Sequence, residues 1–215
     1  MVAVVSRPVT NRWPLLAMLG IAAAAALAFW IIAAAPYLRW DPAKFGDAFW
    51  PRRYELLVHI AGGSIALLVG PLQLWLGETR SKLAWHRTLG TLYLLGVVVG
   101  AAGAYYLALT TSLGGIYGAG LFGLAVAWSI TTAMAYIAIR RRAIDQHREW
   151  MIRSYVVTLA FVVFRALVAV LSIIGVGSLP DRLALASWAC WAVPLVLLEP
   201  CLQLRKLQRS EPRSA

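Results

Sequence analysis

The sequence contains few charged residues. Only 13% of its 215 residues are Asp, Glu, Lys or Arg, against roughly a quarter in an ordinary soluble domain, and 61% are hydrophobic. Acidic residues are scarcest, with 9 Asp and Glu against 20 Lys and Arg, so the formal net charge is +11. Nucleic-acid binding needs a basic patch on a soluble fold, whereas these basic residues stand between long apolar runs. The composition therefore predicts a membrane protein whose partner is lipid, with no nucleic acid involved.

Common signatures of soluble enzymes are also lacking. The sequence has no glycine-rich phosphate loop, no Cys-His zinc spacing and no nucleophile triad. Its two cysteines, Cys190 and Cys201, are separated by roughly 16 Å along one helix, which is too far for a disulfide. Clues to function must therefore come from polar residues inside the apolar runs.

Six apolar stretches are long enough to cross a bilayer, which takes roughly 20 helical residues. They cover about 13–38, 56–77, 88–110, 118–140, 150–176 and 183–204. The third and fourth are separated by Thr-Ser-Leu-Gly-Gly-Ile-Tyr-Gly at 111–118, a composition typical of a tight turn. The sequence thus predicts an all-α integral membrane protein of six transmembrane helices, forming a single domain over 1–215.

Basic residues predict the orientation of these spans. With both termini on one side, 14 Lys and Arg residues flank the spans on that side and five on the other. The positive-inside rule then predicts cytoplasmic termini, a cytoplasmic tail at about 205–215 and a bacterial inner (cytoplasmic) membrane location. The basic clusters would also attract anionic lipid.

Three of the predicted spans carry a stripe of small and polar residues at helical spacing. These stripes include Glu55, His59 and Gln73 on the second span, His86, Gly90 and Tyr93 on the third, and His147, Met151, Ser154, Thr158 and Arg165 on the fifth. Because polar side chains avoid lipid, the stripes predict a four-helix core of spans two to five, with spans one and six peripheral. His147 and Arg165 are five whole turns apart, so one continuous helix would present both on the same face.

The predicted depths separate the polar residues into two layers. Glu55 and His59 would lie near the outer surface, with Arg165 and Tyr105 or Tyr106 at comparable depth, whereas Gln73, His86, His147 and Glu149 would lie near the cytoplasmic one.

Three sequence strings are similar to those of a known family. They are Gly-Pro-Leu-Gln-Leu at 70–74, Trp-His-Arg-Thr-Leu-Gly-Thr-Leu-Tyr at 85–93 and His-Arg-Glu-Trp-Met-Ile-Arg-Ser-Tyr at 147–155, followed by Arg165. Together they resemble prokaryotic predicted membrane proteins grouped as domain of unknown function 2306, over roughly 54–172. The resemblance marks His59, Gln73, His86, Arg87, Gly90, His147, Trp150, Met151, Arg153 and Arg165 as characteristic positions, and Thr91 replaces the family's usual second arginine. It implies the topology and no activity.

One functional hypothesis is a redox membrane protein that binds haem b or a quinone. Neutral imidazole is a common axial ligand, and His86 and His147 lie at equal predicted depth on different helices. Gly90 would make room for the ring, and Met151 lies one turn from His147. This arrangement looks like one half of the ascorbate-reducible transmembrane cytochromes b. A quinone could instead be hydrogen-bonded through its carbonyl oxygens by histidine and arginine.

A second hypothesis is a non-catalytic accessory subunit of a membrane complex, or a small transporter. Glu55, His59, Gln73, Tyr105, Arg153 and Arg165 would then be a structural polar core that holds the helices in register. Other membrane subunits or a second copy of the chain would be its partners. In this interpretation Arg165 bonds helix carbonyls and Glu55, and the two cytoplasmic histidines are interfacial.

Overall fold

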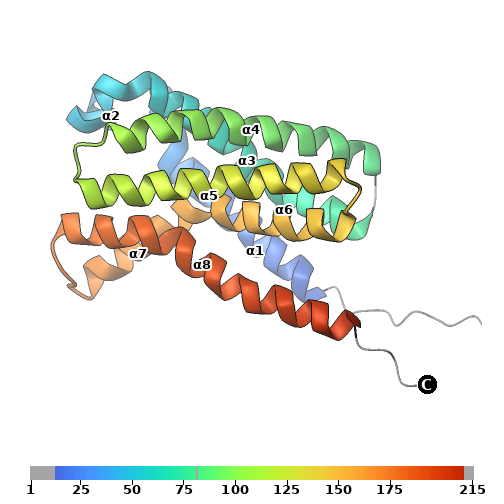
Figure 1. Cartoon of the computed structure of the whole chain (residues 1–215). Helices are drawn as coiled ribbons and strands as arrows, with labels where there is room; N and C mark the ends of the chain where they lie inside the picture. Colours follow the sequence, from blue (N-terminus) through green and yellow to red (C-terminus); the bar gives the residue numbers. More distant parts are fainter. Residues whose placement is uncertain (1–12, 81, 211–215) are drawn as a thin grey trace, which may run out of the picture.

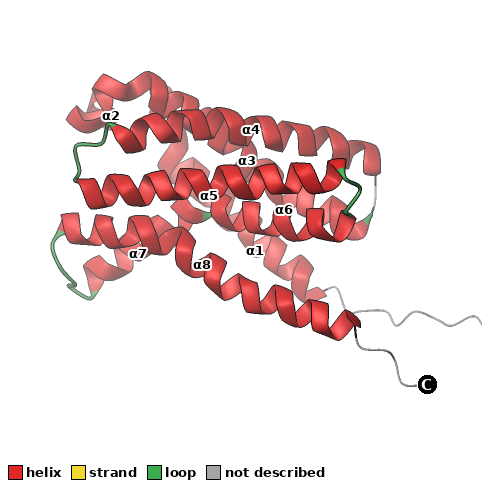
Figure 2. Ribbon diagram, viewed as in Figure 1, coloured by secondary structure: helices red, strands yellow, loops and turns green. Residues whose placement is uncertain are grey.

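The computed structural model describes residues 13–80 and 82–210, and every regular element in that range is a helix (Figures 1 and 2). The α-helices are α1 (Trp13–Phe29), α2 (Pro42–Phe49), α3 (Arg53–Thr79), α4 (Leu83–Leu109), α5 (Gly115–Arg140), α6 (Ile144–Thr158), α7 (Ala160–Ile173) and α8 (Leu179–Ser210). A π-helical turn, Trp30–Ala34, and a 3-10 helix, Ala35–Arg39, continue α1, and a second 3-10 helix, Trp50–Arg52, leads into α3.

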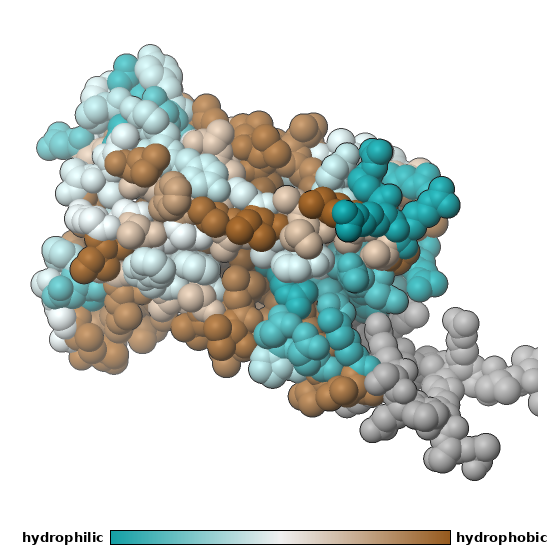
Figure 3. All heavy atoms as spheres, viewed as in Figure 1, coloured by the Kyte–Doolittle hydropathy of each residue, from teal (hydrophilic) through white to brown (hydrophobic). Residues whose placement is uncertain are grey.

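The helices have the length and apolarity of membrane spans. Five are long and apolar enough to cross a bilayer, and the bent pair α6–α7 makes a sixth when it is counted as one span. The visible surface carries apolar side chains across its middle and hydrophilic ones gathered toward its ends (Figure 3). The chain is therefore an all-α membrane protein, as its composition predicts.

The bundle has two ends, which we name by the segments they hold. The terminal end contains the start of α1, the α3–α4 and α5–α6 connections and the end of α8 (Figure 1). The distal end contains α2, the α4–α5 connection and the α7–α8 connection.

Four helices form a closed ring, in which α3 packs against α4, α4 against α5, α5 against α6 and α6 back against α3. The α3–α4 contact is the closest, because glycines face each other there. A Cβ atom built on Gly62 would lie 2.2 Å from the backbone nitrogen of Gly100 and 2.4 Å from the carbonyl oxygen of Gly96. Small residues let membrane helices approach in this way. The predicted core of spans two to five corresponds to this ring.

Helices α1 and α8 pack on the outside of the ring. α1 lies against α3 and α7, and α8 lies against α5, α6 and α7. The prediction that the last span has no small or polar face is wrong, because Ser187 of α8 is fully buried. Its hydroxyl fills the space where a Cβ atom on Gly120 would stand, 2.2 Å from that position.

The fifth predicted span is broken. α6 ends at Thr158, α7 begins at Ala160, and the two helices differ in direction by 41°. No proline or glycine lies between residue 150 and Gly175 to signal the break. The expectation that His147 and Arg165 share one helix face is therefore wrong, because they belong to separate helical segments.

An aromatic cap covers the distal end. Tyr37, Trp40, Phe45, Trp50 and Tyr54 make ring contacts with centroid separations of 5.2–6.3 Å. Aromatic rings of this kind gather where apolar membrane meets water. The cap closes the bundle above the cavity described next.

Candidate functional site

A cavity of about 310 Å³ lies in the distal half of the bundle. Most of its wall is apolar, with contributions from α1, α3, α4, α5, α6 and α7. The polar or ionisable side chains that line it are Tyr37, Arg52, His59, Ser64, Thr111, Tyr117, Trp128, Thr158 and Arg165. Ligand pockets typically measure about 300–1,000 Å³ and combine apolar walls with a few polar groups. This cavity meets both conditions.

Two helix irregularities border the cavity. The π-helical turn Trp30–Ala34 lies on one side, and the Trp30 indole nitrogen donates to the hydroxyl of Ser64 at 2.8 Å. The break between α6 and α7 lies on another side, next to Thr158 and Phe161. π-Helical turns often occur at functional sites because they re-aim nearby side chains.

His59 is the titratable group deepest in the cavity wall. Its Nδ1 lies 2.9 Å from the carbonyl oxygen of Gly100, which can only accept, so Nδ1 carries the proton and donates. Phe161 and Trp128 flank the ring, with centroids at 5.7 and 6.4 Å. Nε2 makes no hydrogen bond to the described residues and is not sealed from the cavity. The neutral ring therefore offers a lone pair to a ligand.

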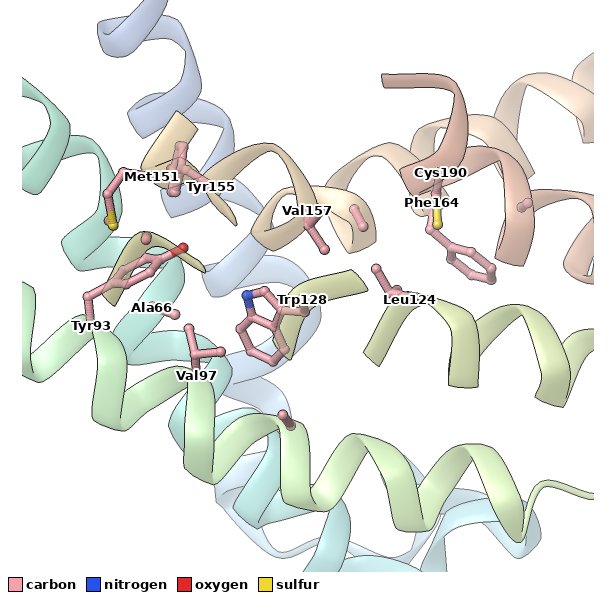
Figure 4. Packing of buried hydrophobic residues seen from close by; sticks show 14 of the residues in the cluster. Ala66, Tyr93, Val97, Leu124, Trp128, Met151, Tyr155, Val157, Phe164 and Cys190 are labelled. Carbon is pink, nitrogen blue, oxygen red and sulfur yellow. The ribbon is translucent and has the colours of Figure 1, made fainter. Parts of the chain in front are cut away.

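A network of hydroxyl groups runs from the cavity wall into the bundle. The Trp128 indole donates to Thr158 Oγ1 at 2.9 Å, and the Tyr93 hydroxyl lies 2.8 Å from both Thr158 Oγ1 and Ser154 Oγ. Thr132 Oγ1 lies 2.7 Å from Ser154 Oγ, and Thr158 donates to the carbonyl of Ser154. Figure 4 shows Tyr93 and Trp128 pointing inward among the buried apolar side chains. The network joins α4, α5 and α6 in mid-bundle.

Three polar residues predicted for the cytoplasmic layer meet at the terminal end. Gln73 Nε2 lies 3.4 Å from His86 Nε2, and His147 donates from Nδ1 to the carbonyl of Ala135 at 2.8 Å. His86 lies on α4 and His147 on α6, which are opposite one another in the ring, and the two side chains are near enough for their charges to interact. Gln73 Oε1 and His86 Nδ1 are buried and have no partner among the described residues.

The space beside the glycines near these histidines is filled by the protein's own side chains. A Cβ atom on Gly90 would lie 2.7 Å from the amide nitrogen of Gln73, and one on Gly77 would lie 3.1 Å from the His86 ring. Met151 is buried in the core. Two imidazoles on opposite helices, one of them fixed by a carbonyl, are the kind of donor that a haem iron needs, but the Gln73 amide lies beside Nε2 of His86 and beside Gly90. The recess at Gly90 opens to a haem only if Gln73 moves away.

The predicted contact between Glu55 and Arg165 is absent among the described residues. His59 bonds Gly100, and Glu55 Oε2 is buried without a partner. Tyr105 donates to Ser129 at 3.1 Å, which links α4 to α5 outside the cavity. Arg165 lines the cavity and makes no ion pair with Glu55.

Arg153 belongs to an ionic cluster at the terminal end. Its guanidinium lies 2.6 Å from Glu199 of α8 and 3.7 Å from Glu149 of its own helix, and Lys206 of α8 lies 2.8 Å from Glu149. A separate pair, Arg148 and Glu78, joins α6 to α3. Arg153 is thus a link between helices rather than part of a pocket.

No group of three or more His, Cys, Asp or Glu residues within the described ranges is placed to hold a metal ion. A protein-only metal centre is therefore not among the candidate sites in that part of the chain.

The fold and these sites define a polytopic helix-bundle membrane protein with a distal cavity and two histidines at its terminal end. The family model of predicted membrane proteins DUF2306 matches residues 56–202, and the chain belongs to that family. The match extends beyond the predicted 54–172 into α8, which carries Glu199. No curated protein and no solved structure matches the chain.

The sequence prediction includes three of the polar cavity residues, His59, Thr158 and Arg165, and misses the other six, which are Tyr37, Arg52, Ser64, Thr111, Tyr117 and Trp128. In the sequence Arg52 is one of the basic residues that flank the spans, and Tyr117 and Trp128 lie on a span without a polar stripe. The signal available for Arg52 was its place just before the apolar run of α3, two turns ahead of His59.

Proposed function

We propose that this protein is a redox-type membrane protein that binds a lipid-soluble quinone in the distal cavity. The supporting observation is His59, whose Nδ1 is fixed by Gly100 while Nε2 faces an apolar cavity with aromatic walls. A neutral imidazole held in this way accepts a hydrogen bond from a quinol hydroxyl. The cavity reaches Phe161 and Trp128, whose rings can flank the flat quinone ring.

His59→Leu is expected to weaken binding of a short-chain quinol at least tenfold, because one buried hydrogen bond to the ligand is lost, a cost of about 1.4 kcal/mol. Isothermal titration calorimetry on the full chain in nanodiscs measures this change. His147→Leu is the control at the opposite end of the bundle and should leave the affinity unchanged. Equal affinities for His59→Leu and the unchanged protein would contradict the proposal.

A second candidate function is haem b binding at the terminal end, which the imidazoles of His86 and His147 on opposite helices favour. His147 Nδ1 is held by the Ala135 carbonyl, so its Nε2 lone pair is free to bind iron. Bound there, the haem would carry single electrons. His86 would exchange its contact with Gln73 for the iron, and the amide of Gln73 would leave the recess beside Gly90.

Haem binding predicts a sharp reduced α-band in the absorption spectrum of protein purified from cells grown with ample haem. Dithionite should produce the band, and His86→Ala or His147→Ala should each abolish it because one axial ligand is lost. His59→Ala should retain it. A preparation without any such band would exclude the haem candidate and leave the quinone proposal unaffected.

The orientation in the membrane is part of the same proposal. Most basic residues near the span ends lie at the terminal end, including Arg140, Arg141 and Arg142. The positive-inside rule supports a cytoplasmic terminal end in a bacterial inner membrane. The distal cavity would then face the outer half of the bilayer.

A further inference from the structure

The charges around the distal cavity are all of one sign. The guanidinium groups of Arg52 and Arg165 line it, and no carboxylate is among the lining residues that the structure describes. Both guanidinium groups are close enough to the Tyr117 hydroxyl to interact with it electrostatically. The two cations and Tyr117, near the start of α5, thus line the same cavity.

Arg52 is held by uncharged groups. It is only 9% exposed, and it donates to the carbonyl of Ala48 from Nε at 3.0 Å and Nη2 at 2.5 Å. Nη1 donates to the carbonyl of Thr110 at 2.7 Å, and the Phe49 ring lies 5.6 Å away. These dipoles hold the guanidinium in place, leave one N–H of Nη2 without a partner among the described residues, and supply no counter-ion for its positive charge.

Arg165 is held even less firmly. It lies on α7, five residues after that helix begins, and makes no hydrogen bond or ion pair with the residues that the structure describes. Arg165 is an exposed residue at the rim of the cavity lining, and no hydrogen bond from the described residues fixes its guanidinium, so it can adjust to a ligand.

A cation at membrane depth without a counter-ion is costly, because the apolar surroundings cannot replace its hydration. The cost falls when an anion binds beside it, and a planar guanidinium suits an oxygen anion in particular. The deeper wall of the cavity is apolar, with Leu67, Leu124 and Val157 among its residues. One end of the cavity thus suits a negative charge and the other suits hydrocarbon.

We infer that the distal cavity selects amphiphiles with an acidic head, which binds between Arg52 and Arg165 while the apolar part lies deeper, toward His59. The head is an oxygen acid carrying one negative charge, such as an acidic hydroxyquinone or a long-chain carboxylate. Arg52 lies seven residues before His59 on the same helical path, about 10 Å along the axis, so a ring-sized group fits between the two positions. This inference rests on the proposed function only in placing the ligand in the same cavity.

Four probes distinguish the contribution of an acidic head to binding from the contribution of a quinone ring. They are an alkylated 2-hydroxy-1,4-naphthoquinone, the same compound without its hydroxyl, a long-chain carboxylate and the alcohol of equal chain length. Affinities are measured by calorimetry on the full chain in neutral nanodiscs. We expect each acidic probe to bind at least tenfold more tightly than its neutral counterpart.

Three variants then test whether Arg165 in the cavity wall causes the preference for acidic probes. Arg165→Gln should reduce the acidic-to-neutral ratio to below about threefold, and Arg165→Lys should retain most of it because the charge remains. Arg39→Gln removes an exposed cation from the same end of the bundle and should leave the ratio unchanged. Thermal unfolding of each variant checks that the fold is retained.

The outcomes distinguish this inference from the quinone proposal. If both naphthoquinones bind equally, the inference is wrong and the quinone proposal stands. If the carboxylate binds and neither naphthoquinone does, the quinone proposal is wrong and the inference stands. Failure of all four probes to bind folded protein overturns both, and an effect of Arg39→Gln as large as that of Arg165→Gln overturns the inference.

Discussion

Gly62→Ala is expected to lower the free energy of unfolding by about 3 kcal/mol, at the upper end of overpacking costs. The added Cβ atom would lie 2.2 Å from the backbone nitrogen of Gly100 and 2.4 Å from the carbonyl oxygen of Gly96. Both of these neighbours are backbone atoms, so no side chain can rotate away. Relief requires α3 and α4 to separate along their whole contact.

The measurement is thermal unfolding of the purified protein in a mild detergent, followed by circular dichroism. For a chain of this size, 3 kcal/mol corresponds to a fall in Tm of about 6–12 °C. Gly63→Ala is the matched control, since a Cβ atom there would meet nothing within 4 Å and alanine favours a helix more than glycine does. Similar Tm values for the two variants would contradict the close approach of α3 and α4.

Gly62 and Gly63 show how precisely helical periodicity in the sequence can locate a packing face. The stripe through His59 correctly indicates the face of α3 that packs on α4, and it includes Gly63. The tightest contact is nevertheless at Gly62, which is buried while Gly63 is only partly so. A stripe of small residues locates a face to within one residue, because neighbouring glycines look alike in sequence and only the partner helix distinguishes them.

The spans themselves follow from hydrophobicity, and their ends differ from prediction by a few residues. The break after Thr158 could not be anticipated, because residues 150–176 carry neither proline nor a turn signal before Gly175. The contacts beside the break are tertiary. Ser154 and Thr158 bond across to Tyr93 on α4, and Arg165, beyond the break, lines the cavity.

The candidate site was predicted only in part for a similar reason. His59 and Arg165 stand out as polar residues within apolar runs, and the structure places both in the wall of one cavity. Arg52 is indistinguishable in sequence from any basic residue at a span end. Its role depends on the 3-10 helix Trp50–Arg52, which places it against the carbonyls of Ala48 and Thr110.

Arg153→Met is expected to lower the free energy of unfolding by about 1–2 kcal/mol, because it breaks a partly buried ion pair in which the Glu199 side chain is 45% exposed. The Arg153 side chain is 12% exposed, and its partner Glu149 is 19% exposed. Methionine keeps much of the apolar stem of arginine, so the measured loss of stability reflects mainly the removal of the positive charge. Without Arg153, Glu199 of α8 loses its partner on α6, and the terminal half of α8 should separate first.

A double-mutant cycle isolates this contact. Arg153→Met combined with Glu199→Gln should be about 1 kcal/mol more stable than the sum of the two single losses predicts, since the lone carboxylate is removed as well. Arg141→Met replaces an exposed arginine at the same end and should change stability by less than about 0.5 kcal/mol. If Arg153→Met matches Arg141→Met, the ion pair contributes nothing measurable, and α8 is held by its apolar contacts and by its other polar ones, such as Lys206 with Glu149 and Trp188 with the carbonyl of Ile116.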